Sequence, residues 1–292
     1  MDEQTPFQRA AADFAQSRLA LCGLGLLILI LLAAVFAPLI SPQNPYDLAQ
    51  IDIMDSRLPP LARSPSGAIY WLGTDDQGRD MLSGIFHGLR ISLGVSLAST
   101  LAALAIGMSL GLAAGWFGGR LDTLIMLIAD IQLSFPAILI ALVLLALLGQ
   151  GLDKIVISLV AVQWAYYART VRGAALVERT REYIEAATCL ALPQSRIVLR
   201  HLLPNCLPPL IVVATVQVAA AISLEATLSF LGLGLPITEP SLGLLISNGF
   251  GYMLSGKYWI SFFPGVALLL TIVSINLVAD RLRDVLNPRL QS

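Results

Sequence analysis

The sequence predicts an all-α, polytopic membrane protein with six transmembrane helices. Of its 292 residues, 57% are hydrophobic and only 13% are charged, and the mean hydropathy is +0.78. A soluble protein of this size carries about 25% charged residues. The apolar residues are collected into long uncharged runs, and a bilayer core requires about 20 residues of helix. Composition and run length together therefore favour a multi-pass membrane protein.

The first two runs are long enough to span a bilayer. Leu19 to Ile40 is uncharged, and it exceeds the about 7–15 apolar residues of a cleaved signal peptide, so we interpret it as a retained span. Ile91 to Phe117 is the second run. Its glycines Gly107, Gly111 and Gly115 recur every four residues, which predicts close helix packing within the chain.

Four further spans are expected. An amphipathic segment, Leu121 to Asp130, precedes the third span, Ile131 to Gly149, which Pro136 is expected to bend. The fourth, Ile155 to Ala168, is short and requires Arg169 and Arg172 to snorkel to the headgroups. The fifth and sixth spans are Cys206 to Leu224 and Tyr258 to Ala279.

The cationic residues predict which side each segment faces. With the N-terminus inside, six of the 18 lysines and arginines lie in outer segments, and the other twelve lie inside. The six are Arg57, Arg63, Arg79, Arg90, Lys154 and Lys257. This bias follows the positive-inside rule, so both termini and residues 179–205 are expected in the cytoplasm.

Several chemistries are not indicated. The sequence has no G-x-x-x-x-G-K-[ST] phosphate loop, no H-E-x-x-H and no G-x-S-x-G motif, and its three cysteines do not have the spacing of a metal site. No basic tail suggests nucleic acid. We therefore expect a non-enzymatic chain without a metal or cofactor of its own, whose energy comes from a partner.

The segment from Arg179 to Asn205 is the longest charged, amphipathic interruption between apolar runs. Its apolar residues have helical spacing. Pro193 can begin a second helix and Pro204 can end it, so we predict two short helices with a bend between Ala191 and Pro193. A cytoplasmic loop with this much helical order predicts a docking surface, although an amphipathic helix lying on lipid is the alternative.

This segment resembles the EAA loop of ATP-binding-cassette importer permeases. Glu185-Ala186-Ala187, the small residue Ala191 and Leu203-Pro204 reproduce the spacing of that motif. Ala191 stands where the family usually has Gly. His201 stands where Ile is common in the wider family, although His is familiar in the peptide-transporter branch.

A second resemblance lies in the polar loop of residues 41–88. Leu72-Gly73-Thr74-Asp75, Gly78-Arg79-Asp80 and Gly88-x-Arg90-x-Ser92 are similar to a signature of dipeptide, oligopeptide and nickel permeases, C-type subunit. From the residues alone, the aspartates are expected to fold the loop by bonding local backbone N–H groups rather than to contact a substrate.

The resemblance implies the transmembrane domain of a type I importer and a set of partners. The partners are a second homologous permease subunit, two ATP-binding subunits that carry ATP and Mg, an extracytoplasmic solute-binding protein, and membrane lipid. It also implies that the loop is the element coupled to the ATP-binding subunits. The residues assigned to that contact are Glu182, Glu185, Ala186, Ala187, Ala191, Arg196, Arg200 and Pro204.

Two acidic residues near the ends of spans are candidates for a gate or pathway. Glu225 follows the fifth span and Asp130 precedes the third. An acid near membrane depth is a functional candidate by default. For Glu225, a buried polar kink is an equally good interpretation, and both remain open.

The expected organisation has three parts. Residues 1–87 hold the N-terminal tail, the first span and an extracytoplasmic loop; residues 88–282 form the ABC transmembrane type-1 domain; residues 283–292 form a cytoplasmic tail. The expected function is a permease subunit for di- or oligopeptides in a bacterial inner membrane. The alternatives are the same role for nickel or another small solute, or a self-sufficient secondary transporter, which would need ionisable groups deep in several spans.

Overall fold

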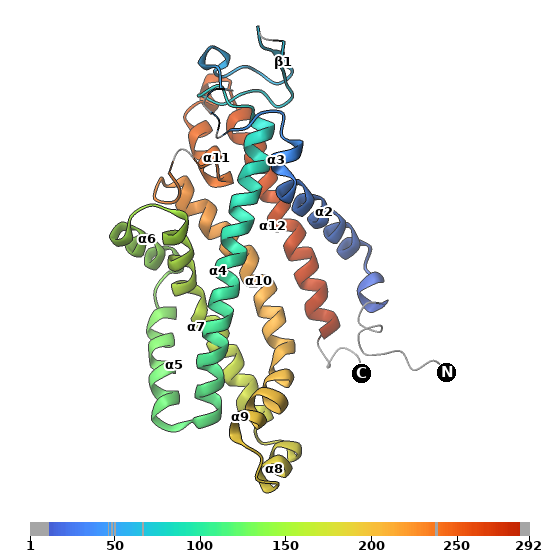
Figure 1. Ribbon diagram of the computed structural model, residues 1–292, viewed down its shortest axis with the longest axis vertical. Helices are drawn as coiled ribbons and strands as arrows, with labels where there is room; N and C mark the ends of the chain where they lie inside the picture. The colour runs from blue at the N-terminus through green and yellow to red at the C-terminus, as the bar shows by residue number, and fades with distance from the viewer. Residues whose placement is uncertain are drawn as a thin grey trace.

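The structure is a computed structural model that describes residues 12–286 except residues 46, 48, 50, 66, 237 and 238. The expected tail of residues 283–292 therefore lies mostly outside the described residues. Its first four residues, 283–286, are not a tail, because they continue the last long helix. The apolar sequence folds as a bundle of long helices with a polar cap at one end (Figure 1).

Five long helices form the bundle: α2 (Arg18–Val35), α4 (Met81–Phe117), α7 (Leu152–Glu178), α10 (Leu203–Phe230) and α12 (Trp259–Leu286). Shorter helices connect them: α3 (Ala37–Ile40), α5 (Gly119–Leu133), α6 (Ala137–Leu148), α8 (Glu182–Cys189), α9 (Gln194–Arg196) and α11 (Leu242–Phe250). The remaining elements are η2 (Ile53–Asp55), the π-helix η3 (Ile197–Leu202), η4 (Met253–Ser255), and the strands β1 (Ala62–Arg63) and β2 (Ile69–Tyr70). The strands pair antiparallel at the end of the molecule opposite α8 (Figure 1).

The all-α membrane class is confirmed. Among the described residues, 4 helices are long and apolar enough to cross a membrane: Arg18–Val35, Met81–Phe117, Gln194–Phe230 and Trp259–Val285. A fifth span results if α5 and α6 are taken together. The remaining expected span, the fourth (Ile155 to Ala168), lies in α7, whose 27 residues are long enough to cross but include polar and charged side chains.

The core of the bundle is the packing of α4 against α7. An added Cβ at Gly115 would lie 2.8 Å from Ala175 Cβ, and at Gly107 and Gly111 it would collide with the backbone of Trp164 and Ala168. The expectation that this glycine face serves close helix packing is confirmed. The absence of side chains there lets the two backbones approach closely.

The third expected span is not one bent helix. α5 ends at Leu133 and α6 begins at Ala137, and the two helices meet at 93°. Pro136 has no N–H to continue the α5 ladder, so the chain turns there instead of bending gently. The expected single helix over residues 131–149 is therefore wrong, and α6 extends away from the bundle (Figure 1).

α4 begins ten residues before the uncharged run that predicted it. Asp80 caps the helix, and its carboxylate accepts from Ser83 N at 2.8 Å. The expected loop 41–88 thus ends at residue 80. The expected domain boundary between residues 87 and 88 falls inside this continuous helix, so it does not separate two structural units.

Candidate functional site

α8 forms the tip of the molecule at the end opposite β1 and β2 (Figure 1). Glu182 and Glu185 lie in its first turn, where their charge complements the helix dipole. The helix ends as expected just before Ala191. There the N–H groups of Ala191 and Leu192 donate to the carbonyls of Thr188 and Ala187, which is a Schellman motif.

Ala191 has the left-handed conformation that such a motif requires, with φ of 53°. Glycine adopts this conformation without strain, whereas an alanine Cβ is disfavoured by about 1–2 kcal/mol. The bend is therefore retained even though the sequence has Ala where the resemblance predicts Gly. The strain is local, and it is held by the two hydrogen bonds of the motif.

The second helix of the loop begins as expected after Pro193 but does not end at Pro204. α9, η3 and α10 follow one another without a break, so the helix enters the bundle directly. The backbone of Ile197–Leu202 has the wider π-helical turn immediately before Pro204. Pro204 lacks an N–H, but it lies at the start of α10, where helices tolerate proline. The predicted stop at Pro204 is wrong.

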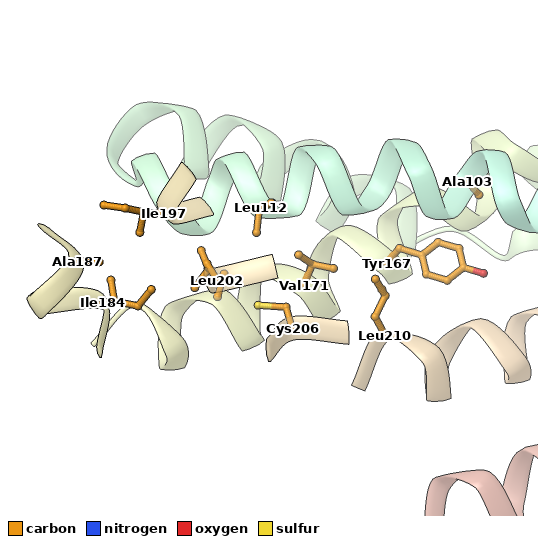
Figure 2. Close-up of a cluster of buried hydrophobic side chains, with 11 residues drawn as sticks. Ala103, Leu112, Tyr167, Val171, Ile184, Ala187, Ile197, Leu202, Cys206 and Leu210 are labelled. Atoms are coloured by element: carbon orange, nitrogen blue, oxygen red, sulfur yellow. The ribbon is translucent and has the colours of Figure 1, made fainter. Parts of the chain in front are cut away.

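One side of the loop packs inward. Ile184, Ala187, Ile197 and Leu202 belong to a buried apolar cluster that continues along the bundle through Cys206 and Val171 (Figure 2). Ala187 is only 6% exposed. The structure therefore places its methyl group inside this chain, and not on the outer surface where we expected it to contact a partner.

The other predicted coupling residues lie on the outer side. They are exposed, and they are Glu182, Glu185, Ala186, Ala191, Arg196, Arg200 and Pro204. Leu190 and Leu199 are also exposed between them, at 75% and 62%. We call this set the loop face. It combines exposed apolar side chains with both signs of charge, a composition suited to protein contact.

Three side chains clamp the loop face to the bundle. The Tyr183 hydroxyl donates to Glu178 Oε2 at 2.7 Å and accepts from Asn205 Nδ2 at 3.0 Å. Burial and the Glu178 carboxylate raise the pKa of Tyr183 to about 12, so it remains a donor at neutral pH. α7, α8 and α10 are thereby joined through one hydroxyl. Sequence reasoning missed Glu178 and Tyr183, because no local spacing shows that they meet.

A fourth residue fixes the start of the loop. Arg179 Nη1 donates to the carbonyl of Gly115 at 2.9 Å, at the end of α4. This charged donor satisfies a carbonyl that the helix end leaves without an intrahelical partner. The loop is thus attached to α4, α7 and α10.

The acid Asp130 forms an ion pair with Arg169 from α7. A second ion pair joins the same two helices, α5 and α7. Arg172 donates to both carboxylate oxygens of Asp122, with Nη2 to Oδ2 at 2.7 Å. We expected both arginines to snorkel to lipid headgroups, but the structure pairs them with aspartates of α5. These contacts fix α5 against α7, and they assign no pathway role to Asp130.

Glu225 is fully buried on α10, at the end of the bundle away from α8. Its Oε1 accepts from the Ser229 hydroxyl at 2.8 Å, and the hydroxyls of Ser92 and Ser241 border the carboxyl group. Ser241 also caps α11. The carboxyl group therefore lies where α4, α10 and α11 meet, which agrees with the structural interpretation left open by the sequence.

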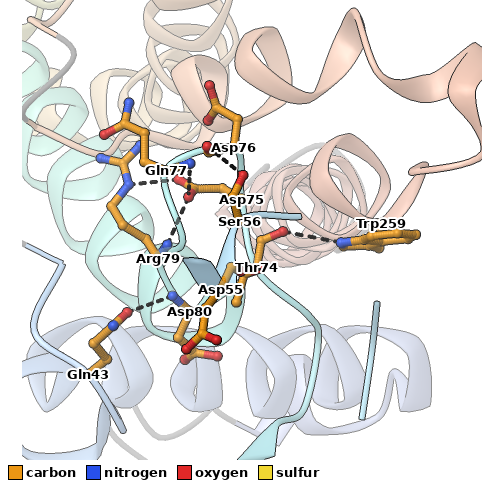
Figure 3. Close-up of polar contacts among 10 residues, drawn as sticks. All are labelled: Gln43, Asp55, Ser56, Thr74, Asp75, Asp76, Gln77, Arg79, Asp80 and Trp259. Carbon is orange, nitrogen blue, oxygen red and sulfur yellow. Dashed lines mark hydrogen bonds and ion pairs between the residues drawn. The ribbon is translucent and has the colours of Figure 1, made fainter. Parts of the chain in front are cut away.

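The aspartates of the polar loop have structural partners, as expected (Figure 3). Asp75 Oδ1 accepts from the backbone N–H groups of Gln77 and Arg79, both at 2.9 Å, and its Oδ2 pairs with Arg79 Nε at 2.7 Å. Burial raises the pKa of Asp80, which caps α4. Trp259 Nε1 donates to the carbonyl of Thr74 at 3.2 Å and joins the loop to α12.

Within the described residues, no group of three His, Cys, Asp or Glu side chains is arranged to hold a metal ion.

Two family models match the chain. Residues 107–292 match the binding-protein-dependent transport system inner membrane component, and residues 5–60 match the N-terminal TM domain of oligopeptide transport permease C. A solved structure of the inward-facing MetNI methionine ABC transporter contains a chain with the same fold. The TM-score is 0.57 at 23% identity, and the match covers 71% of this chain and 98% of that one.

Relatives match along nearly the whole length. A putative peptide transport system permease protein of Brucella suis biovar 1 is 38% identical, over 99% of this chain and 94% of its own. The dipeptide permease DppC of Haemophilus influenzae is 36% identical, over 99% and 96%. The oligopeptide permease OppC of Bacillus subtilis is 36% identical, over 97% and 89%. The chain therefore belongs to the family of binding-protein-dependent transport system inner membrane components, as a multi-pass, non-catalytic permease subunit of an ATP-driven importer that works with separate ATPase and solute-binding proteins.

Proposed function

We propose that this subunit carries di- or oligopeptides and that its loop face receives the movement of the ATP-binding subunits. One observation carries the second part. The loop has an exposed outer face with Glu182, Glu185 and Arg200, while its inner face is packed against the bundle through Ile184 and Ala187. An element that is exposed on one side and anchored on the other can pass a displacement from a partner to the spans.

The apolar part of the loop face favours a protein partner over lipid. Leu190 directly follows α8, the helix at the tip of the molecule (Figure 1), and the residues around it in the sequence carry both signs of charge. A helix that lies on anionic lipid typically has a cationic polar face. In the proposed complex, Glu185 makes a charge-assisted contact with an ATP-binding subunit, and Ala186 lets the two surfaces approach closely.

The complete complex that we propose has four membrane-associated chains. This chain and a homologous permease subunit line the pathway, and two ATP-binding subunits, with ATP and Mg, occupy their cytoplasmic side. An extracytoplasmic binding protein delivers the solute to the end with β1, β2 and α11. The peptide class is supported by the relatives described above, whose names specify peptide, dipeptide and oligopeptide transport. Nickel or another small solute is the alternative cargo.

The orientation follows from the charge count, with both termini and the loop face in the cytoplasm. Single cysteines can test it in a background without Cys22, Cys189 and Cys206. Cysteines at the exposed positions Arg63 and Leu254 should react with an impermeant thiol reagent added to the extracytoplasmic side. A cysteine at Arg196 should react only after the membrane is opened, and its labelling in intact cells would contradict the orientation.

Transport by the reconstituted complex tests the cargo. We expect ATP-dependent uptake of labelled di- or oligopeptides that depends on the binding protein, with no competition from nickel ions. Uptake of nickel without peptide uptake would replace the peptide proposal, and it would leave the membership of the family unchanged. Purification of the tagged chain should also recover ATP-hydrolysing subunits, which a self-sufficient secondary transporter would not bring with it.

A further inference from the structure

A groove of about 950 Å³ lies at the end of the bundle away from α8. Its walls come from the end of α3 and the following turn, from α4 and from the start of α7. Its polar rim includes Ser41, Asn44, Arg90 and Asp153. Its floor is apolar, with Ile91, Gly94, Val95, Ala98, Val156 and Ile157. We call it the α4–α7 groove.

The groove crosses the boundary between apolar and polar sequence. The first span ends at Ile40, directly before Ser41. The uncharged run of α4 begins at Ile91, directly after Arg90, and α7 begins at Leu152, directly before Asp153. Three elements therefore change from apolar to polar at the level of the rim. In a bilayer this is the level at which a lipid headgroup joins its acyl chains.

The charge of the rim favours an anion. Arg90 is exposed, and within the described residues it makes no hydrogen bond or ion pair. The charge of Asp153 on the rim is already paired with Lys154, the next residue of α7, at 2.6 Å. A phosphate on Arg90 would supply the missing partner, since guanidinium groups bind phosphate through two parallel N–H donors.

The floor has space for an acyl chain. A Cβ built on Gly94 meets no atom within 4 Å, so the α4 backbone itself is uncovered there. Ile91 and Val95 flank this opening on α4, and Val156 and Ile157 face it from α7. We propose that the α4–α7 groove binds one anionic phospholipid, with its phosphate on Arg90 and an acyl chain along Gly94.

The test uses the assembled complex in nanodiscs of phosphatidylethanolamine with or without phosphatidylglycerol, followed by native mass spectrometry of retained lipid. Arg90→Gln should lower retention of phosphatidylglycerol about fivefold, the factor that corresponds to one cation near a lipid surface. Gly94→Leu should abolish it by filling the floor. The matched controls are Arg63→Gln, an exposed arginine outside the groove, and Gly25→Leu, another helical glycine with open space.

Equal retention in all four variants would overturn the proposal. Loss in Arg90→Gln with full retention in Gly94→Leu would mean an anion site without an acyl chain, and it would also overturn it, as would displacement by millimolar inorganic phosphate. Photocrosslinking from position 94 distinguishes a phospholipid in the groove from a protein in the groove. A crosslink to phospholipid is expected, and a crosslink to the second permease subunit would show that protein fills the groove instead.

Discussion

Asn205 Nδ2 donates a hydrogen bond to the Tyr183 hydroxyl at 3.0 Å, although the two residues lie 22 positions apart in the sequence. The same hydroxyl donates to Glu178. This contact makes α8 part of the bundle, because it joins the loop to the first turn of α10 and the last turn of α7. The loop is therefore connected by hydrogen bonds to the helices that it is proposed to move.

Loss of that contact should weaken coupling more than folding. Tyr183→Phe removes two hydrogen bonds, each contributing about 0.5–1.5 kcal/mol to the free energy of unfolding. We expect a small fall in melting temperature, normal recovery of ATP-binding subunits, and a lower ratio of peptide taken up to ATP hydrolysed. Tyr258→Phe, an exposed tyrosine at the opposite end, is the control. An unchanged ratio in Tyr183→Phe would show that the clamp has no part in coupling.

Ala191→Gly should stabilise the protein. The φ of 53° at this position disfavours alanine, so glycine should relieve about 1 kcal/mol of strain, less its greater entropy in the unfolded chain. The matched control is Ala186→Gly in the middle of α8, which should destabilise by about 1 kcal/mol. Thermal unfolding of the purified subunit measures both, and destabilisation by Ala191→Gly would contradict the Schellman geometry.

A pair of tryptophan variants separates the two sides of α8. Ala187→Trp inserts volume into a packed cluster and should destabilise the subunit by about 1–3 kcal/mol or more, with poor recovery from the membrane. Ala186→Trp adds the same volume to the loop face, so the subunit should fold normally and lose ATP-binding subunits on purification. The reverse assignment, with assembly lost only in a well-folded Ala187→Trp, would contradict the orientation of α8.

Glu225 should prove structural. Glu225→Gln retains an acceptor for the Ser229 hydroxyl, so transport and melting temperature should stay close to those of the parent. Glu225→Ala leaves buried hydroxyls without a partner and should destabilise by about 1–3 kcal/mol. Uptake and thermal unfolding are measured on the same preparations. Loss of uptake in a stable Glu225→Gln variant would instead assign the carboxylate to a gate.

Sequence periodicity predicted the parts of the fold that depend on local composition. The uncharged runs located α2, α4, α10 and α12, and the four-residue spacing of Gly107, Gly111 and Gly115 predicted the face that packs on α7. Pro193 and Ala191 located the bend of the loop. Each of these features follows from the residues themselves, since an apolar run or a turn signal acts over a few positions.

The features that were missed depend on tertiary contacts. The early start of α4 depends on the hydrogen bond that the Gln43 side chain, 37 positions away, accepts from Asp80 N. The Asp80 cap is a local signal, but it precedes the run of apolar residues that located the helix. The inward direction of Ala187 depends on Ile197 and Leu202, which return to it only after the bend. Likewise, Arg169 and Arg172 could reach either headgroups or aspartates, and only the packing of α5 on α7 decides between these.

Charge reversal at Glu185 tests the central claim most directly. Glu185 is exposed on the loop face and contacts no described residue through an ion pair, so Glu185→Lys should leave the fold and insertion intact. The measurement is peptide uptake and transport-dependent ATP hydrolysis in the reconstituted complex, together with recovery of the ATP-binding subunits. Asp280→Lys, the same charge reversal at an exposed position of α12 outside the loop face, is the control. We predict that Glu185→Lys loses assembly, or hydrolyses ATP without uptake, while the control behaves like the parent. Full assembly with full uptake in Glu185→Lys would contradict the assignment of this loop as the coupling element.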